Sequence, residues 1–311
     1  MMSTTHKEDV GKVLNDASLP LKERFRALFT LKNLGGHDSI DLIAQSFKDS
    51  SALLKHELAY CLGQMQDEYA IPVLVKVLED KSQEPMVRHE AGEALGAIGS
   101  KEALPILEQY CKDPVIEVSE TCVLAVERIK YMENEATNSE SLSTNPYMSV
   151  DPAPPSVSQD IDTLRQTLLN ESLLLFERYR ALFSLRNIGT KDAVIALADG
   201  LKCQSALFRH EIAYVLGQIQ HDACIQQLAC NLKDSQENPM VRHECAEALG
   251  SIATEECMKI LEEYLHDKER VVKESCIVAL DMCDYENSDS FQYADTMARL
   301  KQGENLINQS S

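Results

Sequence analysis

The stretch PMVRHEAGEALGAI at residues 85–98 decides the fold, because it returns almost unchanged as PMVRHECAEALGSI at residues 239–252, an offset of 154 residues. Two further blocks repeat at this same offset: RFRALFTLKNLG at 24–35 returns as RYRALFSLRNIG at 178–189, and KHELAYCLGQMQ at 55–66 returns as RHEIAYVLGQIQ at 209–220. Three separate blocks that share one offset indicate an internal duplication.

Each half also repeats internally. Leu31, Leu62, Leu95 and Leu124 occupy matching positions, and they are 31, 33 and 29 residues apart. Within the units, apolar residues recur at the spacing of one helical face. Units of this length and pattern are typical of stacked helix pairs. The sequence therefore predicts an all-α fold, an α-solenoid of eight HEAT-type helical hairpins in two duplicated halves of four.

A change in composition marks the boundary between the halves. Residues 133–160 are rich in Ser, Pro, Asn and acidic residues and have no periodic apolar pattern, which predicts a flexible acidic linker. The halves are then residues 1–132 and 161–285. Residues 286–311 are polar, and we expect a loosely attached tail there.

Charge and cysteine usage restrict the function. The formal net charge is −20, which argues against nucleic acid or an anionic membrane as a partner and suits a basic protein or a cationic substrate. No apolar run approaches the roughly 20 residues of a membrane span. The ten cysteines form no CxxC pair, and this favours reduced thiols in an intracellular protein.

Four His-Glu dipeptides occupy equivalent helix positions: His56-Glu57, His89-Glu90, His210-Glu211 and His243-Glu244. At 100° per residue, each His lies on the side of its helix opposite the apolar stripe, the side that lines the concave face of a solenoid. Only the two middle units of each half carry the dipeptide. A residue pair needed for packing would recur in all eight units, so the clustering favours a chemical role. If the halves face each other, four imidazoles and four carboxylates converge.

A glycine follows each of these histidines by two helical turns: Gly63, Gly96, Gly217 and Gly250. Glycine inside a helix costs roughly 0.5–1 kcal/mol relative to alanine. Four matched copies therefore indicate a structural need. We expect them to leave space for a cavity, and close packing of neighbouring helices is the alternative.

The ligand types indicate a metal. Two His and one carboxylate per ion form the facial arrangement of non-haem Fe(II) oxygenases, and four His with four Glu supply two such sets. A structural zinc site usually takes thiolates, which these clusters lack. Hydrolysis by zinc or manganese stays open on ligand type alone.

The motif PMVRHE in both halves, together with KHELAY and RHEIAY at the paired position, resembles the deoxyhypusine hydroxylase family over nearly the whole chain. The resemblance implies an O2-dependent monooxygenase that holds two Fe(II) ions and acts on deoxyhypusine, a spermidine-modified lysine of one eukaryotic translation factor, completing hypusine. The iron ligands that it implies are His56, His89, Glu90, His210, His243 and Glu244. Glu57 and Glu211 would bind the amines of the substrate. We also expect a monomer in the cytoplasm, with the nucleus as a second location.

Two other classes stay open on the residues alone. One is a HEAT adaptor that binds no metal. The other is a HEAT-type lyase that attaches bilin chromophores, a family that shares the repeat but not the fourfold His-Glu set.

Overall fold

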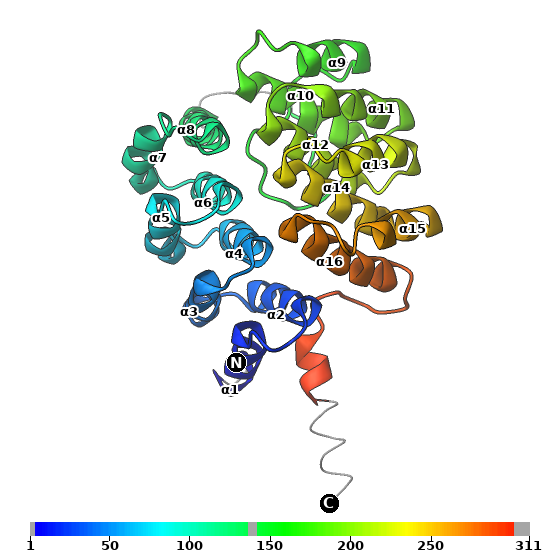
Figure 1. Cartoon of the computed structure of the whole chain (residues 1–311). Helices are drawn as coiled ribbons and strands as arrows, with labels where there is room; N and C mark the ends of the chain where they lie inside the picture. The colour runs from blue at the N-terminus through cyan, green and yellow to red at the C-terminus, as the bar shows by residue number, and fades with distance from the viewer. Residues whose placement is uncertain (1–3, 136–141, 302–311) are drawn as a thin grey trace, which may run out of the picture.

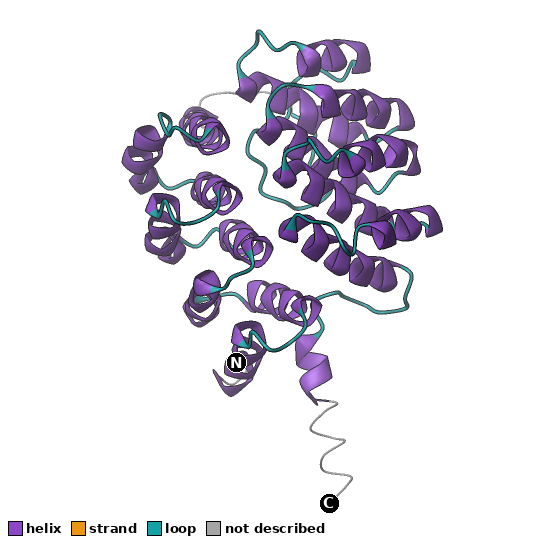
Figure 2. Cartoon of the chain, viewed as in Figure 1, coloured by secondary structure: helices purple, strands orange, loops and turns teal. Residues whose placement is uncertain are grey.

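The computed structural model describes residues 4–135 and 142–301, and this part of the chain is helical with no strand (Figure 2). The eight helical hairpins predicted from the sequence are confirmed. The N-terminal half contains α1 (Thr4–Asn15), α2 (Leu21–Leu34), α3 (His37–Ala44), α4 (Ala52–Gln64), α5 (Ile71–Glu79), α6 (Pro85–Ile98), α7 (Leu104–Tyr110) and α8 (Ile116–Glu135). The C-terminal half contains α9 (Ile161–Leu169), α10 (Leu175–Ile188), α11 (Lys191–Asp199), α12 (Ala206–Ile219), α13 (Ile225–Lys233), α14 (Pro239–Ile252), α15 (Glu255–Glu263) and α16 (Arg270–Glu286). No helix in the described ranges is both long and apolar enough to cross a membrane.

Local sequence signals begin the helices that matter most for function. Pro85 and Pro239 open α6 and α14 at a position where the missing N–H costs nothing. Ser51 and Ser205 precede α4 and α12, and each side chain accepts a hydrogen bond from a backbone N–H of the first turn. Equivalent residues thus fix equivalent helix starts in the two halves.

The even-numbered helices pack side by side within each half, and the four glycines make this possible. A Cβ atom on each glycine would lie within 3.0 Å of an alanine on the next even-numbered helix: Gly63 against Ala94, Gly96 against Ala125, Gly217 against Ala248 and Gly250 against Ala279. Our expectation that these glycines leave space for a cavity is wrong for Gly63, Gly96 and Gly250, whereas Gly217 both packs against Ala248 and lines a cavity between the halves. They allow the backbones of neighbouring helices to approach closely, which also brings the histidines of adjacent units together.

The two halves face each other through these even-numbered helices (Figure 1). At one end α16 contacts α2 and α4, and at the other α8 contacts α10 and α12. Two equivalent hydrogen bonds join the halves: the Ser51 hydroxyl donates to Glu274 and the Ser205 hydroxyl donates to Glu120, both at 2.7 Å. Their offset of 154 residues shows that the halves are related by a pseudo-twofold axis.

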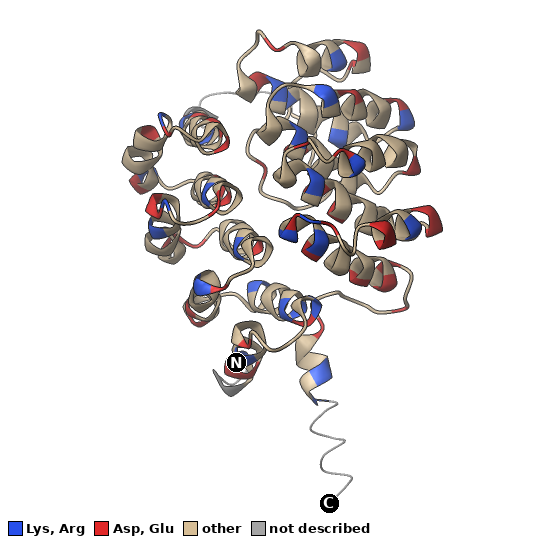
Figure 3. Cartoon of the chain, viewed as in Figure 1, with Lys and Arg blue, Asp and Glu red and all other residues tan. Residues whose placement is uncertain are grey.

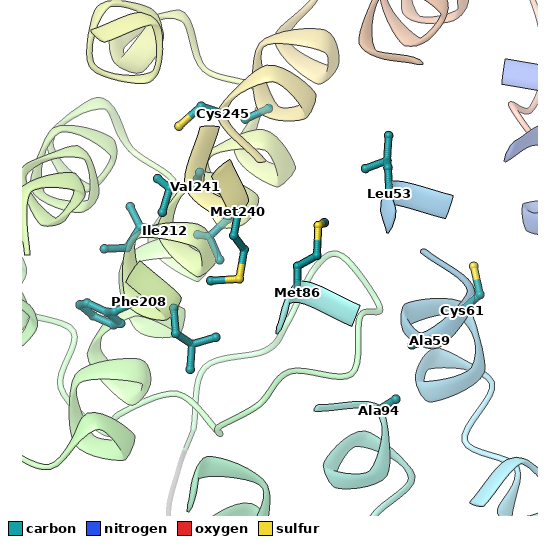
Figure 4. Close-up of a cluster of buried hydrophobic side chains, with 14 of the residues drawn as sticks. Leu53, Ala59, Cys61, Met86, Ala94, Phe208, Ile212, Met240, Val241 and Cys245 are labelled. Atoms are coloured by element: carbon teal, nitrogen blue, oxygen red, sulfur yellow. The ribbon is translucent and has the colours of Figure 1, made fainter. Parts of the chain in front are cut away.

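Apolar contacts continue this arrangement beside the serines. Met86 and Met240 are the second residues of α6 and α14, and both are buried. They lie on facing helices of the two halves in Figure 4 and line one groove together. The concave faces, which a single half would expose to solvent, are therefore covered by the other half.

The connection between the halves differs from the flexible linker expected at 133–160. The helix α8 extends to Glu135, and residues 136–141 lie outside the described residues. Beyond them, Asp151 accepts two hydrogen bonds from the Arg186 guanidinium, at 2.7 and 2.6 Å. The backbone of Val150 exchanges hydrogen bonds with the Gln64 side chain. Residues 142–160 are thus held against both halves, because their backbone and one carboxylate have specific partners there.

The segment after α16 is also attached, although we expected a loose tail from residue 286 onward. Arg26 lies over the Tyr293 ring at 4.4 Å and forms an ion pair with Asp295 at 3.4 Å. The side chain of Thr296 is buried. Residues 302–311, the rest of that predicted tail, lie outside the described residues.

Candidate metal centre

The four histidines of the His-Glu dipeptides meet between the two halves. Their ring centroids are 5.5 Å apart for His56 and His89, 5.2 Å for His56 and His243, and 5.3 Å for His210 and both His89 and His243. All four residues are buried, and the most exposed of them, His210, keeps 4% of its surface accessible. The middle units supply these side chains from α4, α6, α12 and α14, so each half contributes two. The convergence predicted from the repeat pattern is present.

Carboxylates reach these imidazoles across neighbouring units. Glu90 on α6 lies 3.2 Å from Nε2 of His56 on α4, and Glu244 on α14 lies 3.3 Å from Nε2 of His210 on α12. The two contacts are equivalent under the pseudo-twofold axis. In each half, therefore, one carboxylate of the third unit turns toward the histidine of the second unit.

Groups of ligand atoms lie close enough to share an ion. His56, His89 and Glu90 offer atoms that all lie within 4.8 Å of one another, and this is one of the two sets implied by the family resemblance. In the other half, His243 and Glu244 form such a group with Glu247. A third group combines His56, His210 and His243, because the two halves approach so closely.

The ring nitrogens fit a metal. Nε2 of His89, Nδ1 of His210 and both ring nitrogens of His243 are buried without a hydrogen-bond partner, and Nε2 of His210 has only the Glu244 carboxylate nearby. Buried polar atoms without partners are rare and costly. Burial lowers the pKa of His89 and His243 well below its usual value, and the neighbouring imidazoles lower it further. These rings are neutral at physiological pH, and a neutral imidazole is the form that binds a metal ion.

His56 has a different electrostatic environment. Burial alone lowers its pKa, but the charges of Glu90 and Glu57 and their hydrogen bonds outweigh burial and raise the pKa well above its usual value. Glu57 contacts Nδ1 of His56 at 3.3 Å. A metal cation at this ring would replace the proton between the imidazole and the carboxylates.

Glu57 and Glu211 line a cavity beside the imidazoles, with a volume of about 350 Å³, here called the main cavity. Burial raises the pKa of both carboxyls. The charge of Asp151 adds most to the shift of Glu211, the contact with His56 opposes the shift of Glu57, and the charges of Glu90 and Glu244 raise the pKa of both. Such buried carboxylates favour a cationic ligand, because a cation offsets the loss of water.

Sequence reasoning missed four further residues of the main cavity. Tyr60 and Tyr214 lie four residues after the histidines of the second units, and their hydroxyls are 2.9 Å apart across the pseudo-twofold axis. Glu93 and Glu247 lie four residues after the histidines of the third units. A helix places residues four apart on the same face, so the motifs HELAY and HEAGE contained the signal that would have found them.

Glu93 and Glu247 lie near carboxylates of the opposite half. Burial raises the pKa of Glu93 well above its usual value, and Glu211 is the strongest of the charges that add to it. Burial likewise raises the pKa of Glu247, with Glu57 as the strongest charge. The main cavity thus contains two carboxylate pairs that are equivalent under the pseudo-twofold axis, Glu57 with Glu247 and Glu93 with Glu211.

A hydrogen-bonded chain connects the segment 142–160 to the tyrosines. Arg186 donates to Asp151 and to the Gln218 side-chain oxygen, and the Gln218 amide donates to the Tyr214 hydroxyl at 3.1 Å. Val150, Asp151 and Pro152 line the main cavity. The segment therefore forms one wall of the site.

Comparison with known proteins agrees with this geometry. The family model of HEAT repeats matches residues 40–127 and 196–281, and the model of the PBS lyase HEAT-like repeat matches residues 177–203. The lyase repeat covers a single hairpin and indicates only the repeat type. The choice between the lyase family and the family suggested by the His-Glu motifs therefore rests on relatives that align over almost their whole length.

The chain is 60% identical to the deoxyhypusine hydroxylase of Rattus norvegicus, over 97% of this chain and 99% of the relative. It is 62% identical to the deoxyhypusine hydroxylase of Danio rerio, over 94% of this chain and 96% of the relative. The solved structure of human deoxyhypusine hydroxylase in complex with glycerol is 59% identical, covers 90% of this chain and 96% of its own, and superposes with a TM-score of 0.88. The chain therefore belongs to the deoxyhypusine hydroxylase family.

Proposed function

We propose that this protein hydroxylates the deoxyhypusine side chain of a protein substrate, as the names of its relatives indicate for them. The observation that carries the proposal is the cluster of four buried imidazoles with unpartnered nitrogens beside a cavity lined by carboxylates. The cluster fits a redox metal, and the cavity fits a cationic side chain. Neither feature is expected of a HEAT adaptor.

We further propose that the centre holds two Fe(II) ions, bound by two sets of two His and one Glu. One set is His56, His89 and Glu90, and the equivalent set in the other half is His210, His243 and Glu244. The bound iron would activate O2 so that one oxygen atom is inserted into a C–H bond of the substrate. Burial of the imidazoles supports the proposal, since the chain itself keeps bulk water away from them.

Glu57 and Glu211 are proposed to bind the amines of deoxyhypusine. Both are buried, and their raised pKa values come first from burial. Two protonated amines entering the main cavity would neutralise carboxylates that otherwise repel each other. The residues thus orient the side chain toward the metal centre by charge pairing at both sides of the cavity.

The protein substrate is proposed to be a deoxyhypusine-containing eukaryotic translation factor, bound by a monomer of this chain. The formal net charge of −20 suits a partner that presents a cationic side chain. Acidic residues lie on helices of both halves (Figure 3), so either half could contribute to recognition by charge.

Four single substitutions test the proposed roles. Glu90→Gln and Glu244→Gln should lose iron, whereas Glu57→Gln and Glu211→Gln should keep iron and bind the substrate protein more weakly. Iron content is measured by elemental analysis with an optical spectrum of the freshly purified protein, and affinity by calorimetry. Full iron retention in a variant with all four histidines replaced by alanine would reject the metal centre. Iron loss in Glu57→Gln with retention in Glu90→Gln would reverse the two roles.

A further inference from the structure

The Tyr60 and Tyr214 hydroxyls meet at the centre of the main cavity. Their oxygens are 2.9 Å apart, and the two residues are equivalent at the offset of 154 residues. Two equivalent atoms lie at equal distances on opposite sides of the pseudo-twofold axis, which therefore passes between the two oxygens. Each tyrosine follows a histidine of the cluster by four residues, about one helical turn, and lines the main cavity. The pair thus lies on the axis, one turn along the helices from the imidazoles.

The direction of the hydrogen bond between the two hydroxyls follows from the neighbours of Tyr214. The Arg186 guanidinium can only donate, so its contact at 3.1 Å identifies the Gln218 side-chain oxygen as the acceptor. The Gln218 amide nitrogen then donates to the Tyr214 oxygen, also at 3.1 Å. A hydroxyl that accepts a hydrogen bond becomes a stronger donor, because successive hydrogen bonds polarise one another. The Tyr214 proton is therefore directed to the Tyr60 oxygen.

Among the residues that the structure describes, none accepts the proton of the Tyr60 hydroxyl. The hydrogen bond with Tyr214 is the one that this hydroxyl makes, and there Tyr60 is the acceptor. The residue equivalent to Gln218 is Gln64, but the nitrogen and the oxygen of its amide bind the Val150 backbone instead. Since Tyr60 lines the main cavity, its O–H group can donate to a ligand there.

The proposed substrate side chain offers this donor no acceptor, whereas the product offers one. Both amines of deoxyhypusine are protonated at neutral pH and present only N–H donors, but hydroxylation adds an oxygen with two lone pairs. Glu57 and Glu211, the proposed partners of the amines, are equivalent residues on opposite sides of the axis. The carbon chain between the amines therefore crosses the axis, where the tyrosine hydroxyls lie. This holds for either direction of the side chain in the cavity.

We propose that the Tyr60 hydroxyl donates a hydrogen bond to the oxygen that the reaction adds to the carbon chain between the two ammonium groups. Tyr214 and Gln218 support this contact, because their hydrogen bonds leave the Tyr60 proton to the ligand. The carboxylates of the cavity can only accept hydrogen bonds when they are ionised, so a phenol supplies the donor that they lack. This inference rests on the proposed function and names a further residue of the same site.

The test uses the iron-loaded full chain without O2 and two peptides, one with deoxyhypusine and one with hypusine. Calorimetry gives both affinities, and the relative affinity is that for the hypusine peptide divided by that for the deoxyhypusine peptide. Tyr60→Phe should lower the relative affinity by about 2- to 10-fold, as expected for the loss of one neutral hydrogen bond. The affinity for the deoxyhypusine peptide and the iron content should stay nearly unchanged.

Two further variants separate the roles of the tyrosines. Tyr214→Phe keeps the Tyr60 donor, so its relative affinity should fall less than that of Tyr60→Phe. The double variant removes both phenols and should show the largest fall, because no hydroxyl then remains on the axis. Tyr69→Phe is the matched control, since Tyr69 is an exposed tyrosine of the N-terminal half, and it should change neither affinity.

Several outcomes would overturn the assignment. An unchanged relative affinity in the double variant would show that neither phenol contacts the added oxygen. Equal weakening of both peptides in Tyr60→Phe would show a purely structural role, and iron loss in that variant would make Tyr60 part of the metal centre. A larger fall in Tyr214→Phe than in Tyr60→Phe would reverse the direction of the hydrogen bond. If the unsubstituted protein binds neither peptide, the proposed function itself fails.

Discussion

The two ends of the interface between the halves are formed by equivalent residues, but the contacts of these residues differ. Arg186 at one end and Lys32 at the other are equivalent at the offset of 154 residues. Arg186 is fully buried and bound by Asp151 of the segment 142–160. Lys32 is half-buried, lies over the Phe29 ring at 5.6 Å and lines a second cavity of about 310 Å³ beside the main cavity. The connecting segment occurs once, so it can complete only one end of a duplicated molecule.

The cluster of imidazoles in the middle of the interface, in contrast, is formed by equivalent residues of the two halves. Each half supplies two imidazoles and a carboxylate that turns toward the neighbouring unit. The middle of the interface and its two ends therefore have different roles. Duplication gives the two halves equivalent imidazoles and carboxylates, and the segment 142–160, which occurs once, makes the surrounding cavity asymmetrical.

The largest expected effect tests the symmetry of the middle. His89→Ala and His243→Ala are equivalent substitutions, and each should weaken metal binding at least about tenfold, because loss of a ligand costs no less than loss of its outer-shell support. Iron content after dialysis, compared between the two variants, is the measurement. Loss in one variant with full retention in the other would show that the two halves do not contribute equally.

The ends should respond unequally to matched substitutions. Arg186→Met removes the cationic partner of the largely buried Asp151 carboxylate, which keeps only its hydrogen bonds from Asn145 and Ser149, and the free energy of unfolding should fall by about 3 kcal/mol. Lys32→Met removes a half-buried cation without an acidic partner among the described contacts, and the change should stay within about 0.5 kcal/mol. Denaturant unfolding of both variants measures the two changes in the free energy of unfolding. Equal losses would contradict the difference between the ends.

The next smaller effect should come from substitutions of the glycines that set the spacing between neighbouring helices. In Gly96→Ala the new methyl would lie 2.7 Å from the Ala125 Cβ, and we expect a loss of about 1 kcal/mol after the gain in helix propensity. In Gly217→Ala the closest atom, the Ala248 Cα, is 3.0 Å away, so the two effects should nearly cancel. Thermal unfolding compares the variants. A loss of stability in Gly217→Ala as large as that in Gly96→Ala would contradict this difference in spacing.

The smallest expected effect is on the stability of the fold in acid, and it should be the same for equivalent substitutions in the two halves. Arg88 binds Asp113 in the N-terminal half and Arg242 binds Asp267 in the other. Burial alone would raise the pKa of both Asp residues, but the hydrogen bond and charge of each Arg lower it overall. The folded pKa lies below the unfolded value of about 3.9, so this stabilisation is present above about pH 4 and is lost as pH falls further.

Asp113→Asn and Asp267→Asn should therefore each flatten the loss of stability below about pH 4, by no more than about 1 kcal/mol per pair. Urea unfolding at a series of pH values measures this slope. A steeper decline in either variant would contradict the sign of the pKa shift, and a clear difference between them would show that the outer parts of the halves are not equivalent.

Much of the centre could be predicted from the sequence because it depends on local periodicity. The offset of 154 residues and the apolar spacing define the helical hairpins, and a helix fixes the face on which His56 or His89 lies. The same spacing would also have found Glu93 and Tyr60, had the residue four positions after each histidine been considered. The repeat pattern contained these residues, and their roles depend on which carboxylates they meet.

What the sequence by itself determined is the set of repeated helices and the histidines on their shared face, since both follow from residue spacing within one helix. Only the tertiary structure decided that the glycines bring helices together, that Glu90 turns to His56, and that Asp151 closes one end by binding Arg186. The physical reason is the range of the interactions. These contacts join separate helices or separate halves, and no local period of the chain specifies which side chains meet there.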